Sequence, residues 1–213
     1  MKKYLVIGNP IEHSLSPKLH NHWIKENNID AIYEKKKITE NHIKEIISEI
    51  RNEKIQGLNV TIPFKKSIIP FLDALTPEAE KTYSVNTIFK KDNKILGDNT
   101  DIVGFEKALE HINYEVKNKK IFILGAGGVV SSIIYVLKNL GASKITLSNR
   151  TKEKAEDLKK IYSDLEITDW GETCDFNMII NATSLGLKNT DQMELDLSKT
   201  GSDKLFYDVI YNP

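Results

Sequence analysis

Hydrophobic residues in the first half of the chain gather in short runs, separated by stretches in which apolar positions recur at helical spacing. Three runs have the length and residue types of strands: "KYLVIG" (3–8), "AIYEKKKI" (31–38) and "GLNVTIP" (57–63). Two stretches between them are amphipathic, residues 16–27 and 40–52. This alternation predicts parallel strands joined by helical crossovers. Residues 77–101 then predict a short helix and a hairpin that turns at "KDNK".

The same alternation restarts at about residue 102. Helices are predicted over 102–112, 129–141 and 152–162. Strands are predicted at "KIFILGAGG", "KITLSNR", "LEIT", "FNMIINAT" and "KLFYDVIY". We therefore predict an α/β protein of two domains. Residues 1–101 form an α/β domain with a mainly parallel sheet, and residues 102–213 form a Rossmann-like domain.

The amino-acid composition argues against several classes of function for this protein. The 213 residues contain 30 Lys plus Arg and 30 Asp plus Glu, so no net charge draws the chain to nucleic acid or to anionic lipid. No stretch approaches the roughly 18 apolar residues that span a bilayer. The N-terminal apolar run is too short for a signal peptide, and the lone Cys174 cannot form an intrachain disulfide. We expect a cytoplasmic protein without a membrane or nucleic-acid partner, and, because its five histidines are scattered, without a metal site.

A glycine turn marks a candidate nucleotide site. Gly125, Gly127 and Gly128 directly follow a predicted strand and stand at the head of a predicted helix. Glycines in this place let the backbone turn tightly and approach a pyrophosphate, which binds at the helix N-terminus. The third glycine of the usual GxGxxG pattern is replaced by Val130, and small Ser132 is the candidate for the close-packing position. Taken alone, such a turn is also compatible with a plain strand-to-helix connection.

The end of the next strand indicates which dinucleotide is bound. An NAD site usually has an acidic residue about 20 positions beyond the first glycine, where it binds the ribose 2'-hydroxyl. Here "LSNRTKEK" places Asn149, Arg150 and Thr151 at that point. A guanidinium suits a 2'-phosphate, so the sequence favours NADP over NAD. The alternative is that Arg150 is an ordinary solvated loop residue.

Polar residues in the first half form a second candidate site. In "HSLSPKL", Ser16 is predicted to cap the helix that continues through Pro17, and Ser14 and Ser16 together offer two hydroxyls to a carboxylate. In "GLNVTIPFKK", Asn59, Thr61 and Lys65 share one face if the strand alternation continues.

A third polar cluster supplies an acid. "GDNTD" puts Asp101 directly before a helix, either as its N-cap or as a partner for Lys65. A lysine and an aspartate beside a nicotinamide meet the need of hydride transfer at a carbinol, which requires one group to exchange the hydroxyl proton.

These motifs together resemble the shikimate dehydrogenase family. The resemblance rests on "SLSP", "GLNVTIPFKK", "VNT", "GDNTD", "GAGG", "NRT", "NATSLG" and "DVIYNP", in this order, and covers the chain from Gly8 to Pro213. It implies an oxidoreductase that reduces 3-dehydroshikimate to shikimate with NADPH, in aromatic amino-acid biosynthesis. The first domain would then hold the small-molecule substrate and the second NADP, in a monomer or a homodimer.

The resemblance also implies roles for individual residues. Lys65 would be the catalytic acid/base, paired with Asp101. Substrate would be bound by Asp101 and by a set of polar side chains: Ser14, Ser16, Asn59, Thr61, Asn86 and Tyr211. NADP would be bound by the glycine turn and two further loops: Gly125, Ala126, Gly127, Gly128, Asn149, Arg150, Thr151, Lys154, Asn181 and Thr183.

One departure from the family pattern keeps alternatives open. Family members continue past Pro213 with a segment that completes the nucleotide sheet, so we expect the second domain to be incomplete at its C-terminus. One alternative is a quinate-using relative, against which Arg150 argues because such enzymes often prefer NAD. Another is a truncated, non-catalytic member that binds ligand without turning it over. An unrelated α/β protein such as a methyltransferase would need none of the first-domain motifs.

Overall fold

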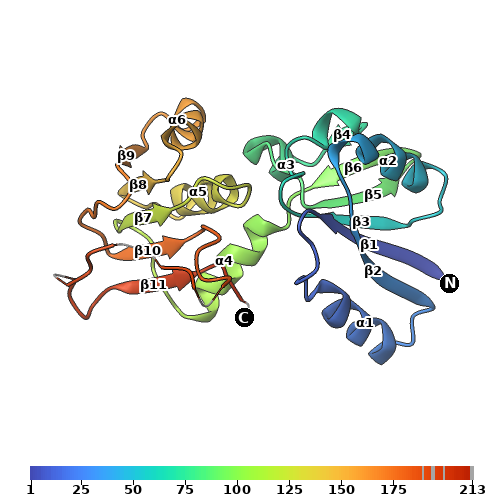
Figure 1. Cartoon of the computed structure of the whole chain (residues 1–213), viewed down its shortest axis with the longest axis horizontal. Coiled ribbons are helices and arrows are strands. Elements are labelled where there is room, and N and C mark those ends of the chain that lie inside the picture. Colours follow the sequence, from blue (N-terminus) through green and yellow to red (C-terminus); the bar gives the residue numbers. More distant parts are fainter. Residues whose placement is uncertain (189, 193–194, 199, 212–213) are drawn as a thin grey trace. The chain divides into compact units, whose positions relative to one another are not determined.

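The chain forms two compact units, Met1–Asp101 and Ile102–Pro213. The computed structural model describes residues 1–188, 190–192, 195–198 and 200–211. Each unit has a sheet with helices packed against it, the first coloured from blue to green and the second from green to red in Figure 1. The α/β class predicted from the sequence is confirmed.

The sheet of the first unit has the strand order β2-β1-β3-β5-β6-β4. The strands are β1 (Lys2–Gly8), β2 (Ala31–Lys37), β3 (Gly57–Val60), β4 (Ala74–Leu75), β5 (Thr87–Lys91) and β6 (Lys94–Asp98). β1 pairs in parallel with β2 and β3, and β4 with β6, while β5 is antiparallel to both of its neighbours. The mainly parallel sheet and the hairpin at "KDNK" were therefore predicted correctly. In that hairpin Asp92 and Asn93 both have positive φ, as a tight turn of this kind requires.

Helices cover both faces of this sheet. They are α1 (Ser16–Glu26), α2 (Ile43–Arg51) and α3 (Pro77–Thr82), with 3-10 turns η1 (Glu40–His42) and η2 (Ile69–Phe71). Figure 1 shows α1 below the sheet and α2 above it. Side chains of β1 divide accordingly: Leu5 and Ile7 join the core around α2, whereas Val6 packs with Tyr33 on the α1 face. This division follows from the alternation of side chains along a strand.

One predicted strand boundary and one predicted helix cap in this unit are wrong. β3 ends at Val60 rather than at residue 63, and the chain then enters turns in which the Phe64 N–H donates to the Thr61 carbonyl (3.0 Å). Residues beyond Val60 therefore do not alternate as a strand does. Helix α1 already includes Ser16, and its N-cap is Leu15, which has helical backbone angles. Pro17 is tolerated at this helix start because it lacks an N–H that would otherwise have no partner.

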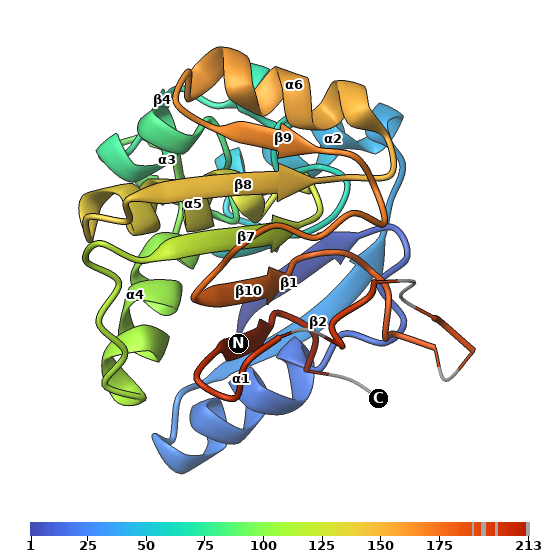
Figure 2. The same ribbon diagram turned by 90° about the vertical axis from the view of Figure 1, so that its left-hand side faces the viewer.

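The sheet of the second unit has the order β11-β10-β7-β8-β9 and is parallel throughout. Figure 2 shows β7, β8, β9 and β10 side by side and pointing the same way. The strands are β7 (Lys120–Leu124), β8 (Lys144–Ser148), β9 (Glu166–Thr168), β10 (Met178–Asn181) and β11 (Leu205–Asp208). The helices are α4 (Asp101–His111), α5 (Val130–Asn139) and α6 (Lys152–Ile161). This is the predicted Rossmann-like arrangement.

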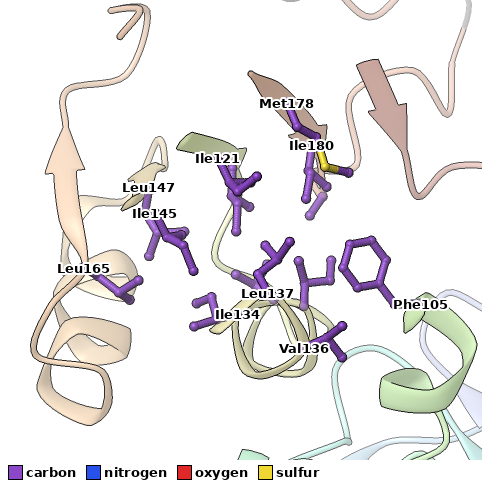
Figure 3. Close-up of a cluster of buried hydrophobic side chains, with 14 of the residues drawn as sticks. Phe105, Ile121, Ile134, Val136, Leu137, Ile145, Leu147, Leu165, Met178 and Ile180 are labelled. Atoms are coloured by element: carbon purple, nitrogen blue, oxygen red, sulfur yellow. The ribbon is translucent and has the colours of Figure 1, made fainter. Parts of the chain in front are cut away.

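A hydrophobic core fixes α5 beneath this sheet. Ile121, Ile145 and Ile180 project from β7, β8 and β10 toward Leu137 of α5, with Phe105 of α4 beside them (Figure 3). Full burial of one such aliphatic side chain stabilises a fold by roughly 1.5–3 kcal/mol. The packing therefore holds the head of α5, and the glycine turn before it, against the carboxyl ends of the strands.

Two further properties concern the described residues alone. In that part of the chain no helix has both the length and the apolar character needed to cross a membrane. The same residues contain no cluster of three or more His, Cys, Asp or Glu side chains suited to a metal ion.

Candidate active site

The first unit brings Lys65 and Asp101 into direct contact. Lys65 lies in the turns after β3, where its carbonyl accepts a hydrogen bond from the Val85 N–H (2.8 Å). Its ammonium donates to Oδ2 of Asp101 at 2.6 Å. The two side chains are only 12% and 21% exposed, so water screens their attraction less than it would at an open surface. A lysine delivered by a turn, and not by a strand, thus reaches the aspartate at the head of α4.

The second carboxylate oxygen of Asp101 is also engaged. Asn86 donates its side-chain N–H to Asp101 Oδ1 (2.8 Å). The backbone N–H of Asp101 donates to Oδ1 of Asn99 (3.0 Å), so the capping contact at this helix start comes from Asn99. Of the two roles considered for Asp101, the structure therefore shows the contact with Lys65, and its carboxylate is oriented from two sides.

Hydrogen bonds fix both the backbone and the side chain of Asn86. Its carbonyl accepts from the Val60 N–H (2.8 Å), and its own N–H donates to the Asp98 carbonyl (3.0 Å). Its side-chain oxygen accepts from the Thr100 N–H (3.0 Å) and from the Thr87 hydroxyl (2.9 Å). The amide that contacts Asp101 therefore has little freedom to turn.

Asn59 lies on β3, and Thr61 follows the end of that strand. Asn59 projects from β3 on the α1 face, directly opposite Thr87 of β5 in the ladder. Its side-chain nitrogen donates to the Asn86 carbonyl (3.2 Å) and to the Thr87 hydroxyl (3.1 Å), and its oxygen accepts from the Tyr33 hydroxyl (2.6 Å). Both N–H groups of Asn59 are thus used inside the protein. Thr61 donates its backbone N–H to Ile7 (2.9 Å), and its side chain is half-buried.

Ser14 and Ser16 stand at the start of α1, both half-buried. The Ser14 hydroxyl accepts from the Ser16 N–H (3.3 Å). The N-cap is Leu15, so the cap predicted at Ser16 is wrong. Burial raises the pKa of Tyr33, and the Ser16 side chain acts in the opposite direction.

In the second unit, the glycine turn approaches the loop after β10. Gly125 has φ +109°, and a Cβ there would lie 2.7 Å from the Ala182 carbonyl oxygen. At Gly127 the nearest atom to such a Cβ is 3.9 Å away, which leaves open space above the head of α5. Ala126 is half-buried, and the buried Val130 fills the position of the usual third glycine. Gly125 is thus required by the fold, while the absence of a side chain at Gly127 gives room for a phosphate group.

The residues that follow β8 carry positive charge. Arg150, Thr151 and Lys154 are exposed, and Asn149 shapes the loop by donating to the Thr151 carbonyl (2.6 Å). Among the described residues neither Arg150 nor Lys154 takes part in a salt bridge, whereas the neighbouring Lys152 pairs with Asp169 (2.7 Å). Two cations beside the glycine turn are therefore available to a phosphate, and the residues present fit NADP.

Asn181 organises the third loop. Its side-chain oxygen accepts from the N–H (3.1 Å) and the hydroxyl (2.7 Å) of Thr183, and its nitrogen donates to the Asp208 carboxylate (3.1 and 3.2 Å). Thr183 lies beside the glycine turn, since its nitrogen would be 3.1 Å from a Cβ on Gly125. Tyr211 is 71% exposed.

Sequence reasoning missed two members of this polar network, Tyr33 and Thr87. Thr87 lies in the "VNT" motif, so a signal was present. Tyr33 is on β2, separated from β3 by β1, and nothing in its local sequence points to Asn59. Only the strand order, which a local pattern does not encode, brings the two together.

Comparison with known proteins agrees with this geometry. The family model described as the shikimate dehydrogenase substrate binding domain matches residues 6–88, and the model described as shikimate / quinate 5-dehydrogenase matches residues 106–206. The "Shikimate dehydrogenase (NADP(+))" of Pelagibacter ubique is 62% identical over 212 residues, covering 100% of this chain and 80% of the relative.

Solved structures give the same result. Shikimate dehydrogenase from Aquifex aeolicus has a TM-score of 0.89 at 37% identity, over 99% of this chain and 79% of that one. Shikimate 5-dehydrogenase from Thermus thermophilus, solved in complex with NADP(H) and shikimate, has a TM-score of 0.88 at 27% identity, over 100% of this chain and 80% of that one. A lysine–aspartate pair in one unit, a glycine turn followed by basic residues in the other, and this agreement over the whole chain lead to one conclusion: the chain belongs to the shikimate dehydrogenase family.

Proposed function

We propose that this chain catalyses the reversible reduction of 3-dehydroshikimate to shikimate with NADPH, a step of aromatic amino-acid biosynthesis. The observation that carries the proposal is the 2.6 Å contact between the Lys65 ammonium and Asp101 Oδ2. Relatives named as NADP(+)-dependent shikimate dehydrogenases, at up to 62% identity, support the same activity.

Lys65 is the proton donor in the direction of reduction. NADPH, when bound, would supply the hydride needed to reduce the C3 carbonyl group of the substrate. The carbonyl oxygen gains negative charge as this happens, and Lys65 transfers a proton to it to complete the hydroxyl group. An ammonium has three N–H groups, and one contacts Asp101, so others remain for the substrate oxygen. In the oxidation of shikimate, neutral Lys65 accepts the hydroxyl proton.

Asp101 keeps Lys65 in place. Its carboxylate accepts from Lys65 on one oxygen and from Asn86 on the other. The lysine is therefore held by an oriented partner before the substrate binds.

The remaining polar side chains of the site are assigned to the substrate. Ser14 and Ser16 bind its carboxylate, since two hydroxyls at a helix N-terminus suit an anion. Thr61, Asn86 and Asp101 bind its hydroxyl groups, with Tyr211 as a further contact. Asn59 also belongs to this set, but both of its N–H groups are used internally, so only its oxygen is available to a substrate hydroxyl.

The second unit is assigned to NADP. The turn Gly125, Ala126, Gly127 and Gly128 binds the pyrophosphate, and Asn149, Arg150, Thr151 and Lys154 bind the adenosine 2'-phosphate. Asn181 and Thr183 line the cofactor from the loop after β10. The open space at Gly127 and the unpaired Arg150 and Lys154 of the described chain support this assignment.

The alternatives receive less support. A preference for quinate would usually go with NAD, and Arg150 argues for a 2'-phosphate. A non-catalytic binding protein would have no use for a partly buried lysine–aspartate pair. We further propose that the protein acts in the cytoplasm as a monomer or a homodimer.

A spectrophotometric assay tests the function directly. Purified protein is incubated with shikimate and NADP, and the absorbance of NADPH is followed; the assay is repeated with NAD and with quinate. We expect reduction of NADP by shikimate at the highest kcat/KM of the four combinations. If shikimate gives no turnover with either cofactor, the proposed function is wrong; if quinate with NAD is preferred, the quinate-using alternative replaces it.

A further inference from the structure

The phenol of Tyr33 reaches the proposed substrate site from a strand that is not adjacent to β3. Its ring is 4% exposed and packs with Val6 and Ile11 on the α1 face of the first sheet. Tyr33 belongs to β2 and Asn59 to β3, and β1 lies between these strands. The side chain therefore crosses β1 to bring its hydroxyl 2.6 Å from Asn59 Oδ1.

The rest of Tyr33 is fixed from two further directions. The side-chain amide of Asn21, on α1, donates to the Tyr33 carbonyl (2.8 Å) and accepts from the Tyr33 N–H (2.9 Å). The ring of His20 stacks on the phenol ring, with centroids 4.2 Å apart and planes 5° from parallel. With backbone and ring both held, the position of the hydroxyl is set by the protein and not by substrate.

The direction of each hydrogen bond follows from the chemistry of the partners. The Asn86 carbonyl can only accept, so the Asn59 atom that faces it is the amide nitrogen. The Asn59 oxygen must then face Tyr33, and the phenol donates to it. Burial raises the pKa of Tyr33, which keeps the phenol protonated and able to donate.

The network continues from Asn59 to the catalytic pair. Asn59 donates to the Thr87 hydroxyl (3.1 Å), which leaves the hydrogen of Thr87 free to donate to Asn86 Oδ1 (2.9 Å). Asn86 in turn donates to Asp101 (2.8 Å). Without the phenol, the Asn59 oxygen would need another hydrogen-bond donor, either a water molecule or the Thr87 hydroxyl. Either change would disturb the hydrogen bonds that Asn59 and Thr87 make with Asn86.

We propose that Tyr33 is a positioning residue of the substrate site, which holds Asn59 and, through it, supports Asn86 and the Lys65–Asp101 pair. This inference rests on the proposed function, and it extends the site to a residue that touches neither the hydride nor the proton. A phenylalanine would fill the same volume and stack on His20 equally well. The hydroxyl group is therefore the part of Tyr33 that the site requires.

The decisive variant is Tyr33→Phe, with Tyr4→Phe as matched control. Tyr4 lies on the neighbouring strand and packs against the same cluster, but its hydroxyl makes no hydrogen bond within the described residues. We expect Tyr33→Phe to lower kcat/KM for shikimate about tenfold, through both kcat and KM, with an unchanged KM for NADP. Tyr4→Phe is expected to retain wild-type constants. Unchanged constants for shikimate in Tyr33→Phe, or an equal loss in Tyr4→Phe, would overturn the proposal.

A double-mutant cycle tests whether Tyr33 acts through the network. Thr87→Val removes the hydroxyl between Asn59 and Asn86 while keeping the shape of the side chain. If Tyr33 acts through Thr87, the double variant will lose less than the product of the two single losses in kcat/KM. Fully multiplicative losses would mean that the two hydroxyls act separately, and the proposed route would be wrong.

A third measurement separates this inference from the proposed function. In 15N-labelled full-length protein, the side-chain NH2 resonance of Asn86 reports on its hydrogen bonds, whether or not the protein turns over shikimate. We expect this resonance to move in Tyr33→Phe and to stay in place in Tyr4→Phe. An inactive wild type that shows this difference would overturn the proposed function alone, whereas an unmoved resonance would overturn the role of Tyr33.

Discussion

Lys65 and Asp101, 36 positions apart in the chain, meet through a single hydrogen bond of 2.6 Å between Nζ and Oδ2. Replacement of Lys65 by alanine removes the proposed proton donor, so we expect kcat to fall roughly a hundredfold or more. Asp101 retains its bond from Asn86, and the fold should persist by circular dichroism. Lys66→Ala is the control, because this neighbouring lysine is exposed. A normal kcat in Lys65→Ala would exclude the lysine from proton transfer.

Arg150→Ala tests the choice of cofactor. The guanidinium is proposed to bind the 2'-phosphate, which NADH lacks, so KM for NADPH should rise on the order of tenfold or more while KM for NADH stays the same. The comparison of the two cofactors within one variant removes any general effect on folding. Lys160→Ala, at the other end of α6 and paired with Asp157, should change neither constant. Equal losses with both cofactors would contradict the assignment.

The two glycines of the nucleotide turn should respond differently to alanine. Gly125→Ala introduces a Cβ at φ +109°, 2.7 Å from the Ala182 carbonyl, and should destabilise the protein by roughly 1–3 kcal/mol. Gly127→Ala meets nothing closer than 3.9 Å, so its melting temperature should remain near that of the wild type. Its new methyl group would instead occupy the space assigned to the pyrophosphate and raise KM for NADPH. Thermal melts and NADPH titrations of both variants distinguish the two effects.

His20 should make stability depend on pH. Burial lowers the pKa of this histidine below its ordinary value of 6.5. The unfolded chain then binds the proton more readily than the folded one, so stability is complete above pH 6.5 and declines as the pH falls below it. The melting temperature of His20→Gln should therefore fall less steeply between about pH 7 and pH 5 than that of the wild type. The exposed His13, replaced in the same way, should leave the slope unchanged.

Local patterns were sufficient for most of the fold and for the most distinctive site residues. The glycine turn and the residues after β8 follow from strand and helix signals close to them in sequence, and both lie where those signals predicted. Lys65 shows the limit of the approach. It was assigned to a strand face by alternation, but β3 ends at Val60 and Lys65 reaches Asp101 from a turn.

Residues whose partners come from distant strands were harder to identify. Ser16 was expected to cap α1, yet it is the first residue of the helix, and the N-cap is Leu15, whose side chain cannot accept a hydrogen bond. Tyr33 was not identified at all. Its contact with Asn59 depends on the order β2-β1-β3, and no pattern within one strand specifies its neighbours in the sheet.

The two hydrogen bonds between the Asn21 side chain and the Tyr33 backbone also affect the tendency of the protein to aggregate. β2 is the outermost strand on its side of the first sheet, and such an edge offers free N–H and C=O groups to a strand from another molecule. At Tyr33 the side-chain amide of Asn21 is hydrogen-bonded to both the backbone N–H and the backbone C=O. These two groups are therefore not available to a strand of another molecule. Lys35, Lys36 and Lys37 follow along the same strand, and lysines are a common feature of edge strands that do not pair with other molecules. The side chain that fixes Tyr33 therefore also protects the sheet against aggregation through strand addition.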